Sequence, residues 1–329
     1  MSREAAPALA EATANIAIVK YWGKRDSHLN LPVADSVAFC LDSLPTRAAV
    51  TPLDAAQDEV FWSGRPVPPP QLGRFLRVLA LLRERSGCRC STRTDIQPQL
   101  PDAVGLAGSS AALAAFALAA SAALRVELSP RELSVMARLG SGSASRSIPG
   151  GFVRWHRGEQ PDGSDSFASR FAPASHWPEL RVLAVILSRE PKSVSSTMGM
   201  IRTSRTSPLF PTFVEQCGRL AGEAQAAVEN RDFERLARVA ELSAQTMHGL
   251  CLTATPPILY VRPSTIEVIE LVCDLNRTHP LFYTLDAGPN PILVTLAPHA
   301  EAVERELTSR FGEIEIVRAG IGGGARLIP

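Results

Sequence analysis

The run from Ala111 to Leu124 constrains the fold more than any other part of the sequence. Its 14 residues are Ala, Leu and Phe with one serine, Ser121. A helix that is apolar on all sides has to be buried, and this run is too short to cross a bilayer. We therefore expect a central buried helix, which a chain of 329 residues, 45% of them hydrophobic, is large enough to enclose.

Short strand-like runs dominate the region before this helix. "NIAIVKY", "SVAFCL", "RAAVTPL" and "EVFW" alternate with turn residues over 13–62, and they predict an antiparallel or mixed sheet. The Pro-rich segment 64–73 predicts a surface excursion, and a helical pattern follows it. "CSTRTDIQPQLP" predicts a strand and a loop. Beyond the buried helix, Ser129, Pro130 and Glu132 predict a capping box and a second helix that stops at Gly140.

The second half of the chain alternates strands and helices. A strand at 152–156 and a loop over 161–178 precede "LRVLAVILS", which predicts a strand, and residues 212–250 are predicted to be helical. A strand, a turn and a strand are expected before a helix at 300–310 and the final strand "EIEIVRA". This order predicts an α+β fold with two lobes, which we divide into residues 1–187 and 188–329.

Charge and cysteine content limit the classes of partner. The chain has 34 Lys and Arg against 33 Asp and Glu, so its formal charge of +1 gives no general attraction to nucleic acid or anionic lipid. Of the six cysteines, the closest pair is Cys88 and Cys90, whose spacing fits neither a zinc site nor a thioredoxin motif. We expect reduced structural thiols in a cytoplasmic protein, because the N-terminal residues also lack the pattern of a signal peptide.

Cations gather where the strand "ANIAIVKYWGKRD" ends. Lys20 follows Ile16 and Ile18 on one face of the extended chain, and Lys24 and Arg25 come directly after a glycine. For Lys20 alone, the simplest interpretation is a stem packed along the sheet with its ammonium in water. The neighbouring cations favour a small anion-binding cluster, since a buried ammonium needs an anionic partner.

Three segments rich in serine could bind anions. "GLAGSSAA" at 105–112 opens the buried helix, so its backbone N–H groups and the helix dipole could hold a phosphate, although it lacks the lysine of a Walker A loop and could be a plain helix cap. "GSGSASRS" at 140–147 is too polar to be buried without a ligand, unless it is a surface linker. Its Arg146 could hold a carboxylate or phosphate bidentately. "KSVSSTMGM" at 192–200 repeats the combination of lysine and serine.

Asp286 is the carboxylate best placed to act as a base. It stands at the end of an apolar strand and before a glycine turn, like the cations at their strand end. An aspartate before a turn is very often only an Asx cap. The six histidines share no metal-ligand spacing, and His248 is expected on a helix face. "GIGGG" at 320–324 is expected to form a C-terminal turn.

Six segments in order along the chain resemble the diphosphomevalonate decarboxylase family of the GHMP kinase superfamily: "NIAIVKYWGKRD", "GLAGSSAA", "GSGSASRSIPGGFV", "KSVSSTMGM" with "TSPLF", "MHGLCLTATPPILY" and "LDAGPN". The resemblance spans roughly residues 12–296, and "KYWGKRD" and "SGSASRS" are specific to this branch. It implies a GHMP kinase fold with a cleft between an N-terminal lobe like ribosomal protein S5 domain 2 and a ferredoxin-like C-terminal lobe.

The resemblance also implies a reaction. ATP would phosphorylate the tertiary C3 hydroxyl of mevalonate 5-diphosphate, which turns it into a good leaving group. Loss of phosphate and CO2 would then give isopentenyl diphosphate, as in the mevalonate pathway of isoprenoid biosynthesis. Magnesium would bridge the ATP oxygens, but no metal ligand is assigned. We further predict a homodimer that binds small molecules and neither nucleic acid nor membrane.

Roles are carried over to matching positions only. Asp286 would accept or orient the proton of the C3 hydroxyl, Arg146 would hold the substrate near that carboxylate, and Lys20 completes the catalytic set. Lys20 and Lys24 are expected to meet phosphates and not a neighbouring side chain. The residues implied to contact the substrate are Asn15, Tyr21, Lys24, Ser141, Gly142, Ser143 and Ser196. Those implied to contact ATP are Gly105, Leu106, Ala107, Gly108, Ser109 and Ser110.

Three departures from the family pattern keep alternatives open. The phosphate loop has a glycine more than the usual GLASSAA, Pro149 stands where an aromatic is usual, and Thr197 stands where some bacterial members have arginine. The extra glycine leaves open which serine meets the ATP phosphates. The other two departures could loosen substrate recognition, so a phosphomevalonate decarboxylase and a mevalonate 3-kinase are alternatives, although Lys24 favours the diphosphate. The alternative that is no enzyme is an inactive GHMP-family ligand sensor, against which the presence of Asp286 argues.

Overall fold

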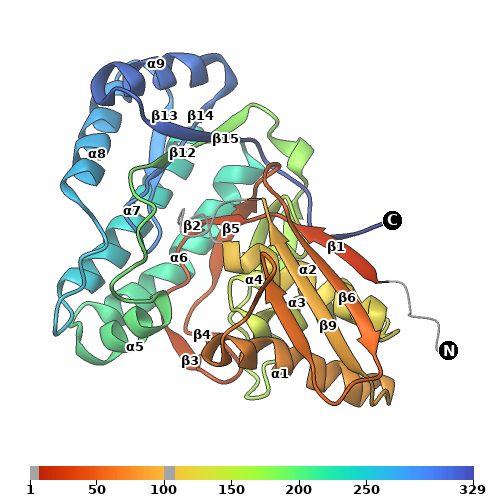
Figure 1. The fold of residues 1–329 in the computed structure, drawn as a ribbon. Coiled ribbons are helices and arrows are strands. Elements are labelled where there is room, and N and C mark those ends of the chain that lie inside the picture. Colours follow the sequence, from red (N-terminus) through yellow and green to blue (C-terminus); the bar gives the residue numbers. More distant parts are fainter. Residues whose placement is uncertain (1–6, 100–107) are drawn as a thin grey trace.

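The computed structural model describes residues 7–99 and 108–329, whose arrangement Figure 1 shows. The first lobe is built on a mixed sheet in the order β16-β1-β6-β9-β7-β8, in which β7 and β9 run parallel and the other neighbours antiparallel. Its strands are β1 (Ala8–Ala12), β6 (Thr46–Leu53), β7 (Glu59–Trp62), β8 (Arg65–Pro66), β9 (Ser91–Pro98) and β16 (Arg326–Ile328). Since β16 pairs with β1, the last strand of the chain returns to the first lobe.

The predicted buried helix is confirmed as α2 (Gly108–Ala123). It packs against β1 and β6 on one side and against α1 (Pro69–Ser86) and α3 (Pro130–Gly140) on others. Its residues from Ala111 to Ala117 are at most 1% exposed. The capping box of α3 is also confirmed, because Ser129 Oγ accepts from the N–H of Glu132 and the Glu132 carboxylate accepts from the N–H of Ser129.

A second, antiparallel sheet in the order β11-β10-β5-β2 lies at the centre of the molecule. Its strands are β2 (Asn15–Val19), β5 (Ser36–Cys40), β10 (Phe152–Trp155) and β11 (Ala168–Ala172). Just beyond β2, the chain forms the small hairpin of β3 (Lys24–Asp26) and β4 (Leu31–Pro32). The short helix α4 (Ala144–Ser147) packs against β5, β10 and β11.

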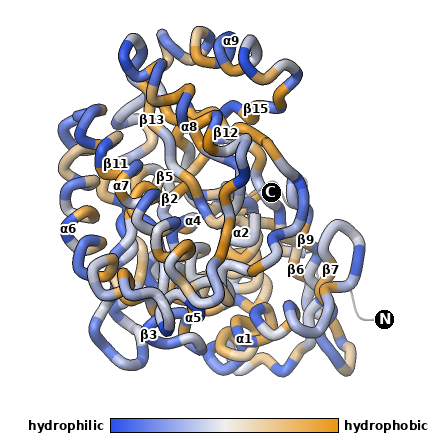
Figure 2. The backbone as a smooth tube through the Cα atoms, turned by 90° about the vertical axis from the view of Figure 1, so that its left-hand side faces the viewer, coloured by the Kyte–Doolittle hydropathy of each residue, from blue (hydrophilic) through white to orange (hydrophobic). Residues whose placement is uncertain are grey.

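The second lobe has an antiparallel sheet in the order β13-β14-β12-β15. Its strands are β12 (Leu180–Ile186), β13 (Leu281–Thr284), β14 (Ile292–Leu296) and β15 (Glu315–Ala319), and its outer helices are α8 (Pro263–Leu275) and α9 (Ala300–Phe311). Figure 2 shows hydrophilic and hydrophobic residues alternating along α9, whose Val303 and Leu307 are buried. The predicted boundary near residue 187 follows β12 and stays a prediction.

Helices α5 (Ser196–Thr206), α6 (Phe210–Glu229) and α7 (Phe233–Leu252) lie in sequence between β12 and β13, two strands of the second lobe's sheet. Helix α7 contacts both β2 of the central sheet and β13 of the second lobe. One hydrophobic cluster correspondingly runs from Ile16 and Phe39 through α6 and α7 to Phe282 and Val294. The ends of β2 and β13, which carry Lys20 and Asp286, are therefore fixed against the same helix.

Some local expectations differ from the structure. Residues 161–178 are not all loop, because they include β11 and the 3-10 turn η1 (Ala174–His176). The helical region 212–250 is divided into α6 and α7 at Arg231, which has a left-handed backbone with φ 53°, and Asp232 caps α7 by accepting from the N–H of Arg235. Helices α5 and α8, strand β1 and the turn η2 (Ala297–His299) were not predicted.

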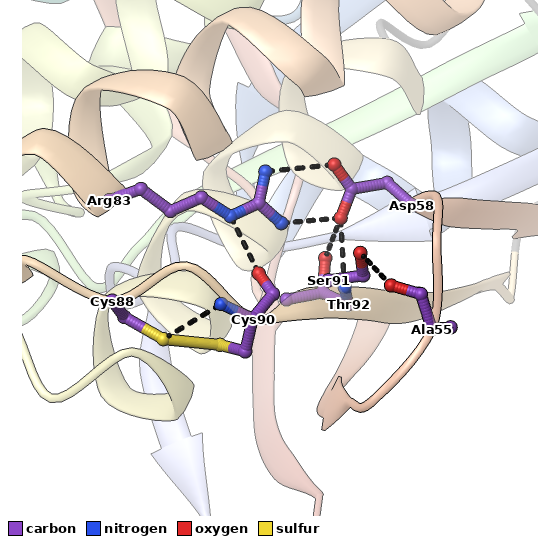
Figure 3. Close-up of polar contacts among 7 residues, drawn as sticks. All are labelled: Ala55, Asp58, Arg83, Cys88, Cys90, Ser91 and Thr92. Carbon is purple, nitrogen blue, oxygen red and sulfur yellow. Dashed lines mark hydrogen bonds and ion pairs between the residues drawn. A yellow bond between two sulfur atoms is a disulfide. The ribbon is translucent and has the colours of Figure 1, made fainter.

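The expectation of reduced thiols is wrong for Cys88 and Cys90, which form a disulfide with Cα atoms 5.7 Å apart (Figure 3). Arg83 of α1 donates to the Cys90 carbonyl and to the carboxylate of Asp58, so the disulfide lies beside an ion pair. The other four cysteines are free thiols. Over 7–99 and 108–329, no helix combines the length and apolar character needed to span a membrane.

Candidate active site

A cavity of about 1270 Å³ is lined by residues from both lobes. The segments that line it include the chain after β2, the loop between α3 and α4, the start of α5 and the chain after β13. Residues 266 positions apart in sequence thus come into contact. The predicted site residues that line it are Lys20, Tyr21, Lys24, Gly108, Ser109, Ser141, Gly142, Ser143, Arg146, Ser196 and Asp286.

Lys20 and Asp286 form an ion pair in this cavity. Lys20 Nζ lies 2.6 Å from Asp286 Oδ1 and 2.9 Å from the Ala17 carbonyl oxygen, and its backbone N–H donates to Ser243 Oγ of α7. The Lys20 side chain is 2% exposed and that of Asp286 is 29% exposed. Lys24 Nζ donates to Asn30 Oδ1 at 2.6 Å. The expectation that these two lysines meet no neighbouring side chain is therefore wrong, because burial requires a partner for each ammonium.

The surroundings keep this pair ionised. Burial acts to raise the pKa of Asp286, but the Lys20 ammonium, and after it Arg146 and Lys192, hold that pKa below its ordinary value. Burial lowers the pKa of Lys20, and the Asp286 carboxylate opposes this. We take both groups as charged at neutral pH, since they lie 2.6 Å apart. Among the described residues, Lys20 is the one donor to the Asp286 carboxylate, so Oδ2 is available to a ligand.

Arg146 is held by buried polar partners. It is 4% exposed, its Nε donates to Asn15 Oδ1 at 2.8 Å, and its Nη1 donates to Ser36 Oγ at 3.0 Å. Asn15 Nδ2 in turn donates to the Ser143 carbonyl and to Ser147 Oγ. Burial lowers the pKa of Arg146 to about 10, against the effect of Asp286, so it is a cation at neutral pH.

This network corrects one argument from the sequence. Segment 140–147 was expected to be too polar to be buried without a ligand, yet α4 is buried and its polar groups are satisfied within the protein. Asn15 does not line the cavity but orients Arg146 from behind, and its contact with the substrate stays a prediction.

Tyr21 presents an unused donor. Its ring packs on Trp155 with centroids 4.6 Å apart, and its buried hydroxyl has no hydrogen-bond partner in the described part of the chain. Burial raises the pKa of Tyr21, so the hydroxyl keeps its proton. A Cβ atom at Gly142 would lie 2.6 Å from this oxygen, so any larger residue there would displace the Tyr21 side chain. The arrangement suits an anion that accepts from the Tyr21 hydroxyl.

A third cation, Lys192, approaches Asp286 from the segment before α5. Its Nζ lies 3.5 Å from Ser196 Oγ, and burial lowers its pKa while Asp286 acts to raise it. Ser195 caps α5 by accepting from the N–H of Met198, which places Ser196 in the first turn. Lys192 was noted in "KSVSSTMGM" but was not assigned to the site, because only the fold brings this lysine near Asp286.

Two family models match successive parts of the chain. Residues 12–168 match the diphosphomevalonate decarboxylase-like N-terminal domain, and residues 182–321 match the mevalonate 5-diphosphate decarboxylase C-terminal domain. The diphosphomevalonate decarboxylase of Aspergillus fumigatus is 38% identical over 324 residues, which cover 92% of this chain and 80% of that protein. The chain belongs to the diphosphomevalonate decarboxylase family.

Other members support the same family. The human diphosphomevalonate decarboxylase is 40% identical over 306 residues, which cover 87% of this chain and 76% of that protein. The solved structure of MDDEF in complex with MVAPP, AMPPCP and magnesium has a TM-score of 0.91 and 34% identity, with 98% of this chain and 99% of that chain covered. The predicted two-lobed GHMP kinase fold is thereby confirmed for this decarboxylase family member.

The residues that the family resemblance assigns to ATP are placed only in part. Gly105, Leu106 and Ala107 lie outside the described residues. Gly108 and Ser109 line the cavity at the start of α2, and Ser110 is fully buried and does not line it. The N-terminus of a helix of this length favours phosphate, so the placement of Gly108 and Ser109 is consistent with the assigned role, which stays a prediction.

The sequence did not predict a second part of the cavity. It is lined by the β7–β8 turn, the first turn of α1 and the end of β9. The available signal was "GRPVPPPQLG", whose prolines hold a loop rigid. Apolar surface combined with a few cations and amides is typical of small-molecule sites. The residues are Trp62, Ser63, Arg65, Pro66, Val67, Pro68, Pro70, Gln71, Arg74 and Pro98.

The cavity has few side chains for a metal. Over the described ranges, no group of three or more His, Cys, Asp or Glu side chains could hold a metal ion. The Asp286 carboxylate and the Ser109 hydroxyl line the cavity, and Ser141, Ser143 and Ser196 add further hydroxyl oxygens. Magnesium usually keeps several waters and binds through one or two carboxylates and substrate phosphates, so these residues fit a magnesium ion that arrives with ATP.

Proposed function

We propose that this protein catalyses the ATP-dependent decarboxylation of mevalonate 5-diphosphate to isopentenyl diphosphate, ADP, phosphate and CO2. The observation that carries the proposal is the pairing of Lys20 with Asp286 beside Arg146 in a cavity lined by further cations and hydroxyls. The related complex of MDDEF with MVAPP, AMPPCP and magnesium supports the choice of substrates.

In the first step, Asp286 orients the C3 hydroxyl and takes its proton as the hydroxyl oxygen bonds to the γ-phosphorus of ATP and ADP leaves. Oδ2 of Asp286, which accepts no hydrogen bond within the described ranges, is the acceptor, while Lys20 fixes Oδ1. Phosphoryl transfer depends mainly on positioning and on cations near the transferred group. Lys20, Arg146 and Lys192 supply this positive charge, and magnesium, when bound with ATP, neutralises charge on the phosphate oxygens.

In the second step, the C3–O bond breaks and its electron pair leaves with phosphate. Positive charge grows at C3, and the electrons of the bond to the carboxylate carbon form the alkene as CO2 departs. Arg146, held rigidly by Asn15 and Ser36, positions that carboxylate for this loss.

The 5-diphosphate of the substrate is assigned to a second group of cavity-lining cations and hydroxyls. The main donors are Lys24 and the hydroxyl of Tyr21, which has no hydrogen-bond partner among the described residues. Ser141, Ser143 and Ser196 add hydroxyls. ATP is assigned to the start of α2 and to the adjoining part of the cavity at the β7–β8 turn.

One assay tests the function. The protein is incubated with Mg-ATP and, separately, with mevalonate 5-diphosphate, mevalonate 5-phosphate and mevalonate, and ADP and CO2 are quantified together. Equal amounts of ADP and CO2 with the diphosphate as the preferred substrate are expected. ADP without CO2 would indicate a 3-kinase, preference for the monophosphate would indicate a phosphomevalonate decarboxylase, and no turnover would indicate a ligand sensor.

Two further expectations stay predictions. A homodimer can be tested by light scattering of the purified protein, and a cytoplasmic location by fractionation of the source cells.

A further inference from the structure

A second, smaller pocket of about 180 Å³ adjoins the main cavity. Lys24 and Met200 line both. The remaining lining residues are Ser27, in the turn after β3, and Ile201, Ser204 and Arg205 of α5. Figures 1 and 2 both show α5 beside the β3 hairpin, so the pocket lies between these two elements.

The two cations that line this pocket, Lys24 and Arg205, have no carboxylate partner among the described residues. Lys24 Nζ donates to Asn30, whose amide is neutral, and burial together with Arg77 lowers the pKa of Lys24. Arg205 is exposed in the last turn of α5, and over 7–99 and 108–329 it has neither an ion pair nor a side-chain hydrogen bond. The nearby carboxylate of Asp26 accepts from the N–H of Leu29 and forms no ion pair in the same ranges.

Asn30 holds the Lys24 ammonium in a defined place. Asn30 is 7% exposed, and its Nδ2 donates to the carbonyl oxygens of Arg138 and Leu139, which leaves Oδ1 for Lys24. The ammonium therefore lies at the junction of the two pockets without a swing of its long side chain. Ser27 and Ser204 add hydroxyls, and Ser204 Oγ donates to the Ile201 carbonyl of its own helix.

The size of the pocket limits its occupant. Sites for whole drug-sized ligands are about 300–1000 Å³, so a pocket of about 180 Å³ is a subsite for one group. Two cations and hydroxyl donors match a phosphate, which Arg can contact bidentately. Because Lys24 is shared with the main cavity, this group must belong to a ligand that begins there.

We infer that Ser27, Ser204 and Arg205, with Lys24, bind the terminal phosphate of the substrate's 5-diphosphate and so select diphosphate over monophosphate. This inference rests on the proposed function. Lys24 lies between the two phosphates, while Arg205 meets the terminal one alone. A monophosphate ends at Lys24 and leaves the smaller pocket empty.

The test compares Arg205→Gln with the wild type on mevalonate 5-diphosphate and mevalonate 5-phosphate at saturating Mg-ATP. We expect kcat/KM for the diphosphate to fall roughly five- to tenfold, mainly through KM, because one exposed charge-assisted contact is lost. For mevalonate 5-phosphate, kcat/KM of the variant should stay within twofold of the wild-type value. Arg202→Gln is the matched control, since Arg202 lies on the same helix, lines neither pocket and donates to the Pro256 carbonyl.

The two substrates separate a specific role from a general one. An equal fall for both substrates in Arg205→Gln, or an equal effect of Arg202→Gln on the ratio, would overturn the inference. Ser204→Ala should shift the ratio in the same direction by a smaller factor, about twofold, since a neutral donor contributes less.

A binding measurement keeps this test distinct from that of the proposed function. Inorganic pyrophosphate is titrated into each variant by calorimetry in the absence of ATP. Weaker binding to Arg205→Gln than to Arg202→Gln supports the pocket, even if the wild type turns over neither substrate. Equal binding to the two variants contradicts it, whatever the protein catalyses.

Discussion

Two aspartates of this protein form partly buried ion pairs that differ in how many hydrogen bonds each carboxylate accepts. Asp58 accepts from both terminal nitrogens of Arg83 and from the backbone N–H and the hydroxyl of Thr92 (Figure 3). Asp286 accepts from Lys20 alone among the described residues. The side chain of Asp58 is 11% exposed and that of Asp286 is 29% exposed.

The comparison separates a structural carboxylate from one that can act on a ligand. For both aspartates, burial acts to raise the pKa and cationic partners bring it below the ordinary value, so the direction of the pKa does not distinguish them. The number of hydrogen-bond donors to each carboxylate distinguishes the two aspartates. Asp58 has its acceptor capacity used by the protein, whereas Asp286 keeps an oxygen for a substrate in the cavity.

Asp286→Asn should have the largest effect on this comparison. The variant keeps the shape of the side chain but loses the charge and the proton acceptor, so we expect kcat to fall roughly 10²- to 10⁴-fold. Substrate and nucleotide should still bind, as calorimetry can measure, because Arg146, Lys24 and Tyr21 are untouched. A kcat within threefold of the wild type would remove Asp286 from the mechanism.

Asp58→Asn should lower the stability of the protein and leave its activity nearly unchanged, the opposite of Asp286→Asn. Removing this charge leaves Arg83 without its carboxylate partner, and we expect the free energy of unfolding to fall by roughly 3 kcal/mol. Activity per folded molecule should stay within twofold, since neither Asp58 nor Arg83 lines the cavity. Urea unfolding and kcat are measured on the same preparation. A large loss of kcat without a loss of stability would break the comparison.

Protonation of His248 tests whether the Lys20–Asp286 pair tolerates another positive charge beside it. The side chain is 9% exposed on α7, its ring lies 6.3 Å from that of Tyr260, and its Nε2 has no partner in the described ranges. Burial, and after it the charge of Lys20, lowers the pKa of His248 to about 4. The imidazole is therefore neutral in the folded protein at ordinary pH.

The sign of the pH effect follows from this lowered pKa. Between about pH 6.5 and 4 the unfolded chain binds a proton at His248 that the folded chain does not, so the stability of the folded state decreases as the pH falls through this window. At pH 5 the loss is roughly 2 kcal/mol relative to neutral pH. His248→Phe should remove this part of the loss. Urea unfolding at pH 7 and pH 5 checks it, and an unchanged pH dependence would contradict it.

Local features of the fold were predictable from the sequence because their causes are local. The apolar run at 111–124 has no alternative to burial, and the capping box at Ser129 is complete within four residues. Asp286 was identified by its place at a strand end before a turn. The family motifs carried the overall fold, since they depend on order along the chain.

Contacts between distant segments were not predictable. The Lys20–Asp286 pair joins strand ends 266 residues apart, and without it Lys20 was interpreted as a ligand for phosphate. Segment 140–147 was judged too polar for burial because Asn15 and Ser36, which satisfy Arg146, come from other strands. The part of the cavity beside the β7–β8 turn depends on packing that no short pattern encodes.

The smallest expected effect comes from removing one of the several hydrogen bonds that Asp58 accepts. Thr92→Val removes the hydroxyl that donates to Asp58 Oδ1 at 2.9 Å but keeps the backbone N–H and both contacts from Arg83. We expect a loss of about 1 kcal/mol in the free energy of unfolding and no change in kcat.

Thr94→Val is the matched control for this hydroxyl. Thr94 is equally buried on β9, but its hydroxyl has no hydrogen-bond partner within 7–99 and 108–329, so replacing it should be neutral or stabilising. Urea unfolding compares the two variants. Equal losses for both would mean that burying a valine on β9, and not the bond to Asp58, sets the cost. A loss for Thr92→Val alone would show that the Thr92 hydroxyl stabilises the folded state through Asp58. Asp286, which accepts from Lys20 alone among the described residues, is then less stabilised but free to bind substrate.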